Sequence, residues 1–189
     1  MLIAALALII IVVVPLVGGR LSNLFRLRLR AMWLIFASLG VQFVILAVVD
    51  DGPDGVLRAI HLTTYGMIMI FLIANRRVPW MWAVALGAVC NFVVIAANRG
   101  VMPASRSAQR AAGLKPRDGF ANSQVVSHPR LRFLGDIFAT PRSLPLANVF
   151  SIGDVILLAG LVPLVIAVCR VPAGEARSFL VPTVDTHVS

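Results

Sequence analysis

The sequence predicts an all-α integral membrane protein with five transmembrane helices and a long loop between the fourth and the fifth. Of its 189 residues 59% are apolar and only 13% are charged, and the mean hydropathy is +0.93. A water-soluble domain carries roughly 25% charged residues to cover its surface. The apolar residues also gather into five almost uncharged runs of 16 to 20 residues. These observations exclude an ordinary soluble domain and indicate a multi-pass membrane protein.

Residues 1–19 form the first predicted span, because none of them is charged. The run does not resemble a signal peptide, since it has no basic start and Gly18-Gly19-Arg20 leads into an arginine-rich stretch. Pro15 is compatible with a spanning helix, because neighbouring helices satisfy the carbonyl group that it frees.

Four further runs predict the other spans, at residues 31–49, 59–74, 78–97 and 151–169. A helix of about 20 residues crosses the roughly 30 Å hydrocarbon layer, so the shorter runs must include interfacial residues. We therefore expect a four-helix transmembrane part over residues 1–97 and a long basic extracytoplasmic loop over residues 98–150. The fifth transmembrane helix follows over residues 151–170, and a disordered cytoplasmic tail over residues 171–189.

Arginines in the short loops predict the orientation. Four arginines crowd residues 20–30 and two lie at 76–77, whereas three aspartates mark residues 50–54. By the positive-inside rule, the two arginine-rich loops are cytoplasmic, the N-terminus is outside and the C-terminus is cytoplasmic. The basic loop 98–150 then lies outside the plasma membrane, and loops near this length follow the rule less strictly.

The net charge of +9 would indicate nucleic-acid binding in a soluble domain. Here 16 of the 17 basic residues are arginines that lie mostly between apolar runs, where they meet lipid headgroups. No aromatic residues are interleaved with them as on a nucleic-acid surface. We expect the protein to contact the lipid bilayer and, in addition, either a membrane-protein partner or a lipid or peptide substrate. We expect no nucleic-acid partner.

The long loop has two kinds of composition. Its middle, residues 104–130, is rich in Ser, Arg, Gly and Asn, which predicts a flexible segment. Its ends, residues 98–103 and 131–154, mix aromatic, Pro, Gly and acidic residues, which predicts packing on the helix bundle. A loop longer than about 15 residues is usually functional or disordered.

Two carboxylates are the candidate catalytic groups. Asp154 lies four residues into the last apolar run, and Asp136 precedes it by eighteen residues. If the intervening chain folds back, the two carboxylates meet at the outer membrane interface. A close pair shares one proton and divides acid and base roles across a water molecule.

The alternative is structural. Ser151 and Asp154 have the spacing of a capping box at a helix start, where Asp154 only satisfies free N–H groups. Asp136 follows Gly135 and is equally explained as a turn residue.

Polar residues on the neighbouring segments complete the predicted site. Asn91 and Asn98 are seven residues apart and therefore share one face of the fourth span. Asn98 and Ser151 would contribute to the site, with Arg99 and Arg142 as counter-charges of the acids. Gly100, just past the helix end, is also explained as an ordinary αL helix stop.

No cofactor or metal is predicted. His61 is the only histidine in any span, so a bis-histidine haem lacks a second ligand, and we expect an interfacial hydrogen-bonding residue. Thr64 and Tyr65 share its helix face. Cys90 and Cys169 lie in apolar runs without metal-site spacing and are expected to be small core residues.

The motifs carry two resemblances. The pattern N-R-G-x-M-P, L-G-D and S-I-G-D over five spans resembles an uncharacterised bacterial family of small multi-pass membrane proteins, which implies no activity. Residues 131–165 resemble lipoprotein signal peptidase: Phe150-Ser151-Ile152-Gly153-Asp154, followed by Gly160, is similar to its F-N-x-A-D motif, and Leu134-Gly135-Asp136-Ile137 to its V-x-D-F. Asn98-Arg99-Gly100 is similar to the N-x-G element of the same family. The second resemblance implies that Asp136 and Asp154 form the dyad of an intramembrane aspartyl peptidase.

Two functions are therefore open. The first is a non-enzymatic membrane subunit or scaffold with a polar site at the outer interface. The second is a membrane-embedded aspartyl-type hydrolase, in which Asp136 and Asp154 activate water against a peptide or a lipid ester.

Overall fold

The computed structural model describes residues 2–16, 20–47, 54–114, 123–143 and 147–171, and it is mostly helical. Seven α-helices lie in the described residues: α1 (Leu2–Leu16), α2 (Leu21–Arg26), α3 (Trp33–Ala47), α4 (Asp54–Ala74), α5 (Met81–Ala97), α6 (Arg106–Ala112) and α7 (Ile152–Arg170). The same residues contain a 3-10 turn, η1 (Arg132–Leu134), and four short strands: β1 (Met102–Pro103), β2 (Ser123–Gln124), β3 (Asp136–Ala139) and β4 (Val149–Ser151).

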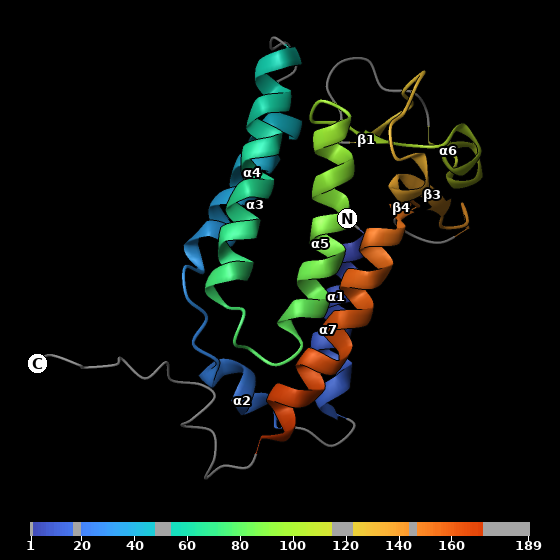
Figure 1. Ribbon diagram of the computed structural model, residues 1–189. Helices are drawn as coiled ribbons and strands as arrows, with labels where there is room; N and C mark the ends of the chain where they lie inside the picture. Colours follow the sequence, from blue (N-terminus) through green and yellow to red (C-terminus); the bar gives the residue numbers. More distant parts are fainter. Residues whose placement is uncertain (1, 17–19, 48–53, 115–122, 144–146, 172–189) are drawn as a thin grey trace, which may run out of the picture.

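Five long helices lie side by side and alternate in direction (Figure 1). Helix α7 packs against α1 and α5, and α4 packs against α3 and α5. The short helix α2 lies across the end of the bundle at which α7 finishes. The largest core cluster joins Leu34, Phe71, Met81 and Val165, which come from four different helices.

Each of the five predicted runs contains one long helix, and residues 31–32, 78–80 and 151 of these runs lie outside the helices. Two segments, Gly55–Ala74 and Ile152–Arg170, are long and apolar enough to cross a membrane, and Trp33–Ile45 and Met81–Ala97 are apolar but shorter. Helix α4 begins at Asp54, before the uncharged run at residues 59–74. The run begins later than the helix because the first turns of the helix carry charged residues. The predicted tail at 172–189 lies outside the described residues.

Glycines allow α5 and α7 to pack unusually closely. A Cβ atom added to Gly87 would lie 2.5 Å from the carbonyl oxygen of Gly153 and from the backbone nitrogen of Leu157. One added to Gly160 would lie 2.7 Å from the backbone of Ala83 and Val84. Small residues that bring two helix backbones together are typical of helix pairs in membranes.

Asparagine side chains connect neighbouring segments at the end of the bundle where α4 and α7 finish. Asn75, at the end of α4, accepts a hydrogen bond from Arg30 N at 2.8 Å and donates one to Arg30 O at 2.9 Å. Asn23 donates to the carbonyl groups of Cys169 and Val171 at the end of α7. Buried amides thus satisfy backbone groups that the helix ends leave open.

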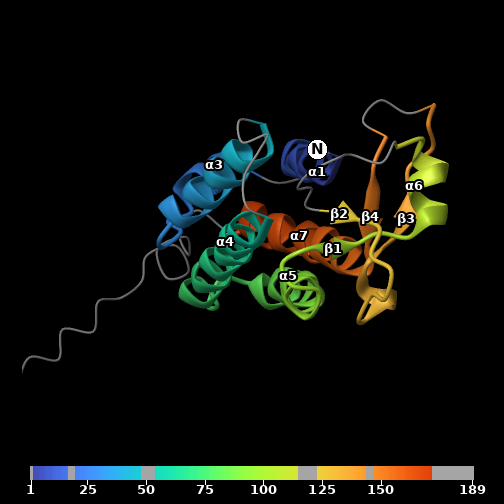
Figure 2. The same cartoon turned by 90° about the horizontal axis from the view of Figure 1, so that it is seen from above.

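The described residues of 98–150, which we call the loop module, form regular secondary structure. Strands β1 and β2 pair in parallel, and β3 pairs with β4 antiparallel. Helix α6 packs on β3 and β4 through Ala108, Ala112 and Val149. The module lies beside the ends of α5 and α7 (Figure 2).

Two sequence predictions need correction here. The chain is not all-α, because the loop module contains four strands. The stretch 104–130 is predicted to be flexible, but within its described part Ser105 caps α6 by accepting from Ala108 N, and Gly113 ends this helix in the αL conformation. Residues 115–122 of the stretch lie outside the described residues. The cap at Ser105 and the stop at Gly113 define a helix of only seven residues. The average composition of the whole stretch does not reveal such local signals.

Candidate functional site

The start of α7 is a complete capping box. Ser151 Oγ accepts a hydrogen bond from Asp154 N at 3.0 Å, and Asp154 Oδ2 accepts one from Ser151 N at 3.0 Å. The predicted capping box is therefore confirmed. A capping box satisfies two backbone donors that a helix start otherwise leaves unpaired.

Asn91 of α5 joins this cap from the neighbouring helix. Its Nδ2 donates to Asp154 Oδ1 at 2.8 Å, and its Oδ1 accepts from Ser151 Oγ at 2.8 Å. Gly153 lies directly against the amide, so any Cβ at that position would collide with Asn91 Oδ1. Ser151 and Asn91 are both buried and Asp154 is half-buried, and the three side chains link α5 to α7.

Asp136 lies next to this cluster through the strand pair. It is the register partner of Ser151 between β3 and β4. Its Oδ2 accepts a hydrogen bond from Ser123 Oγ at 2.5 Å, and its backbone oxygen accepts one from Ser105 N. The side chain is 6% exposed. The loop module is thereby fastened to the start of α7.

Burial raises the pKa of Asp136 from its usual 3.8 to about 6. The negative charge of Asp154 raises the same pKa further, and the hydrogen bond from Ser123 opposes the rise. The two acids therefore interact electrostatically, and Tyr65 lies within electrostatic range of both. Asp136 is a carboxyl group that changes charge near neutral pH.

The other predicted site residues lie elsewhere. Asn98 ends α5, where its amide bonds to both the N–H and the C=O of Arg130 at 2.9 Å. Arg99 is exposed in the αL conformation with φ 57°. Arg142 donates to the carbonyl oxygen of Arg110, on α6.

The structure does not bring the predicted counter-charges, Arg99 and Arg142, into contact with the acids. Within the described part of the chain, neither Arg99 nor Arg142 forms an ion pair with Asp136 or Asp154. Hydroxyl, amide and backbone donors take that place. Ser123 is the partner that sequence analysis missed, because it lies in the stretch that composition marked as flexible.

His61 is a buried hydrogen-bonding residue, as expected. Its Nδ1 lies 2.8 Å from Gly100 O, and its ring meets Tyr65 edge to face at 5.3 Å. Gly100 has φ 86°, so the predicted αL stop after α5 is confirmed. No group of three or more His, Cys, Asp or Glu residues suited to a metal occurs among the residues that the structure describes. Cys169 is buried and Cys90 half-buried, and both are free thiols.

A family model described as a family of unknown function, DUF5317, matches residues 26–166. The chain belongs to this family. The match includes Asn91, Asp136 and Asp154, so the cluster described above lies within the part shared with DUF5317. The predicted resemblance to a family of unknown function is confirmed, whereas nothing supports the resemblance to lipoprotein signal peptidase. No curated protein and no solved structure gives a match.

Proposed function

We propose that this DUF5317 protein is a five-span plasma-membrane protein that serves as a non-enzymatic subunit or scaffold and carries the loop module on the outer face. Its spans are α1, α3, α4, α5 and α7. Only 28% of the apolar window in α4 and 33% of that in α7 are buried inside the protein, whereas the core helix of a soluble protein is mostly buried. Lipid is the environment that such side chains favour.

The outward faces of the bundle support insertion. Large apolar side chains are exposed on α1, α3 and α5, among them Leu8, Phe36, Phe43 and Leu86, with exposed fractions from 49% to 68%. Soluble monomers rarely expose apolar patches larger than a few hundred Å². A bilayer covers these faces without further protein.

Tryptophan and arginine support the proposed orientation. All three tryptophans, Trp33, Trp80 and Trp82, are exposed near the bundle end where α3 begins and α4 leads into α5. Exposed Arg76 and Arg77 lie at the same end. Tryptophan favours the membrane interface, and arginine favours the cytoplasmic side. This end is therefore cytoplasmic in our proposal, and the loop module lies outside.

The hydrogen bonding of Asp154 carries the non-enzymatic assignment. Oδ1 accepts from the Asn91 amide and Oδ2 accepts from Ser151 N, so both oxygens serve the joint between α5 and α7. A carboxylate that activates water needs an oxygen aimed at that water. The cluster is explained fully as a structural joint that holds the loop module.

The alternative is an aspartyl-type hydrolase, and one observation favours it. Asp136 has its pKa raised to about 6 by burial and by the neighbouring charge of Asp154, as in a carboxylate pair that shares a proton. In that case a remaining lone pair of the Asp154 carboxylate binds the water, beside the two hydrogen bonds that Asp154 already accepts.

An Asp154→Asn variant separates the two functions. An asparagine still caps α7 through its oxygen, and a flipped Asn91 amide accepts from the new NH₂ group. We expect this variant to keep its thermal stability and to complement a deletion strain that shows a growth or envelope phenotype. A stable Asp154→Asn protein that loses all complementation, together with a stable and inactive Asp136→Asn protein, would establish the hydrolase instead.

A further inference from the structure

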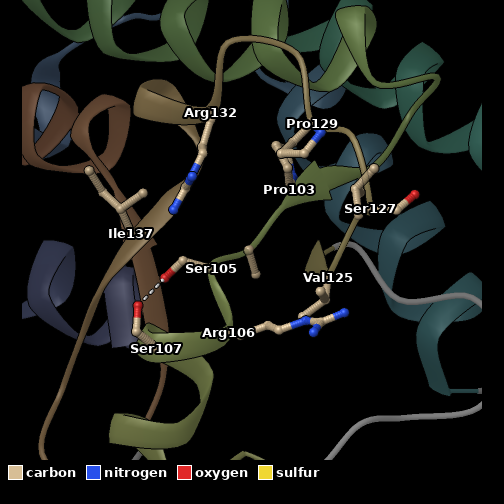
Figure 3. Close-up of a pocket in the computed structure, with 11 residues that line it drawn as sticks. Pro103, Ser105, Arg106, Ser107, Val125, Ser127, Pro129, Arg132 and Ile137 are labelled. Carbon is tan, nitrogen blue, oxygen red and sulfur yellow. Dashed lines mark hydrogen bonds between the residues drawn. The ribbon is translucent and has the colours of Figure 1, made fainter.

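The loop module contains a cavity of about 400 Å³, within the roughly 300 to 1,000 Å³ typical of small-molecule sites. Figure 3 shows Arg132 reaching in from η1 toward Ser105 and Ser107 at the start of α6, whereas Arg106 extends to the other side, toward Val125. Pro103, Val125 and Ile137 supply the apolar part of the lining.

The polar lining of this cavity is positive. Arg106 and Arg132 are both exposed, and no carboxylate occurs among the described residues that line it. Asp136, the neighbour of Ile137 in the sequence, is buried and bonded to Ser123. Ser105 and Ser107 add hydroxyl groups whose oxygens are 3.1 Å apart. Arginine and hydroxyl donors together are suited to a phosphate group.

A second basic cavity of about 540 Å³ shares the wall Val125–Ser127 with the first. Arg99 and Arg130 line it, beside the end of α5. The two cavities thus lie on either side of one short wall, and both are lined by arginines. Positive charge gathered at a concave surface raises the local concentration of anions.

The same segments present apolar side chains on their outer side. Leu131 and Phe133 flank the cavity residue Arg132 and are 37% and 61% exposed. Phe138 follows the cavity residue Ile137, is 41% exposed and stacks on Phe150 at 5.4 Å. Positive lining beside exposed aromatic groups fits a molecule with an anionic head and an apolar tail.

We propose that this cavity binds the phosphate headgroup of an anionic lipid, with Arg132, Ser105 and Ser107 as its ligands and Leu131, Phe133 and Phe138 along its acyl chain. This inference rests on the membrane location proposed above, which brings headgroups to the ends of α5 and α7. The lipid phosphate takes donors from Arg132 and from the two serine hydroxyls, Arg106 adds positive charge on the other side of the cavity, and the acyl chain leaves along the aromatic side.

The test uses the full chain in dodecyl maltoside and a water-soluble probe, dihexanoylphosphatidylglycerol, with binding measured by calorimetry. An Arg106→Gln/Arg132→Gln double variant removes the ligand Arg132 and the second positive charge of the cavity, both from exposed positions, so folding is unaffected. An Arg76→Gln/Arg77→Gln variant removes the same charge from the other end of the bundle and serves as the matched control. We expect the first variant to lose at least about 10-fold in affinity and the control to lose none.

Two further probes identify what is recognised. Dihexanoylglycerol, which lacks the phosphate, and inorganic phosphate, which lacks the chain, should both bind at least about 10-fold more weakly. Equal affinity of the double variant and the wild type, or of dihexanoylglycerol and the phospholipid, would overturn the proposal. Inorganic phosphate that binds as tightly as the phospholipid would replace a lipid site by a phosphate site.

Because the probe is soluble, the cavity is tested whether or not the bundle lies in a membrane. Recovery of the expressed protein in the soluble fraction would overturn the membrane location without deciding probe binding. The two failures are therefore distinguishable.

Discussion

At the scale of single residues, Asn91 is the member of the polar cluster that connects α5 to the start of α7. Its amide pairs with Ser151 and with Asp154, each at 2.8 Å. Replacing it by Ala leaves the buried Ser151 hydroxyl without its acceptor and one carboxylate oxygen of the half-buried Asp154 without its amide donor. A buried polar group that loses its partner costs roughly 1 to 3 kcal/mol.

We therefore predict a clearly lower melting temperature for Asn91→Ala in detergent, measured by differential scanning fluorimetry. Asn98→Ala is the comparison, because its partner Arg130 is exposed and water replaces the lost amide. A smaller loss for Asn91→Ala than for Asn98→Ala would contradict the structural role of the cluster.

Asp136 predicts a pH dependence of stability. Its pKa is raised from 3.8 to about 6, so the folded protein holds this proton more tightly than the unfolded chain does. The contribution is fully present below about pH 4 and is lost as the pH rises through about 6, and it corresponds to at most roughly 3 kcal/mol.

Melting temperatures between pH 4 and pH 7 test this prediction. The melting temperature of the wild type should fall as the pH rises over this range. In Asp136→Asn the part of this fall that is caused by Asp136 should be absent. Ser123→Ala should move the decline to higher pH, because the Ser123 hydrogen bond lowers the pKa of Asp136. Identical profiles for the wild type and Asp136→Asn would show that Asp136 does not titrate in this way.

At the scale of secondary structure, the contact between α5 and α7 depends on the absence of side chains. A Cβ on Gly87 would lie 2.5 Å from backbone atoms of α7, which cannot move away as a flexible side chain would. The whole helix pair must separate to accommodate it.

Gly87→Ala is therefore expected to lower the melting temperature. Gly66→Ala on α4 is the matched control, because nothing lies within 4 Å of its added Cβ and alanine favours a helix by roughly 0.5 to 1 kcal/mol over glycine. Equal effects of the two substitutions would contradict close backbone packing between α5 and α7.

The helices were predictable and the loop module was not, for a physical reason. Long uncharged runs mark helices because lipid selects for apolar side chains along an entire span. The capping box was visible as Ser151 and Asp154 because it is a contact between near neighbours in the sequence. The joining of Asn91 to Asp154, and of Ser123 to Asp136, depends on pairing between distant segments, which no local pattern specifies.

At the scale of the whole molecule, the helix bundle has two different ends. One end carries tryptophans, the Arg76-Arg77 turn and α2, and the other carries the loop module with its arginine-lined cavities. Helix direction alternates through α1, α3, α4, α5 and α7, so these two ends lie on opposite sides of a membrane if all five helices cross it.

Cysteine labelling in intact cells tests this arrangement most directly. In a chain with Cys90→Ala and Cys169→Ala, single substitutions Arg110→Cys and Arg77→Cys place a thiol at exposed positions at the two ends. We predict that a membrane-impermeant maleimide labels Arg110→Cys in intact cells and labels Arg77→Cys only after permeabilisation. Labelling of both positions from the same side would contradict the five-span account.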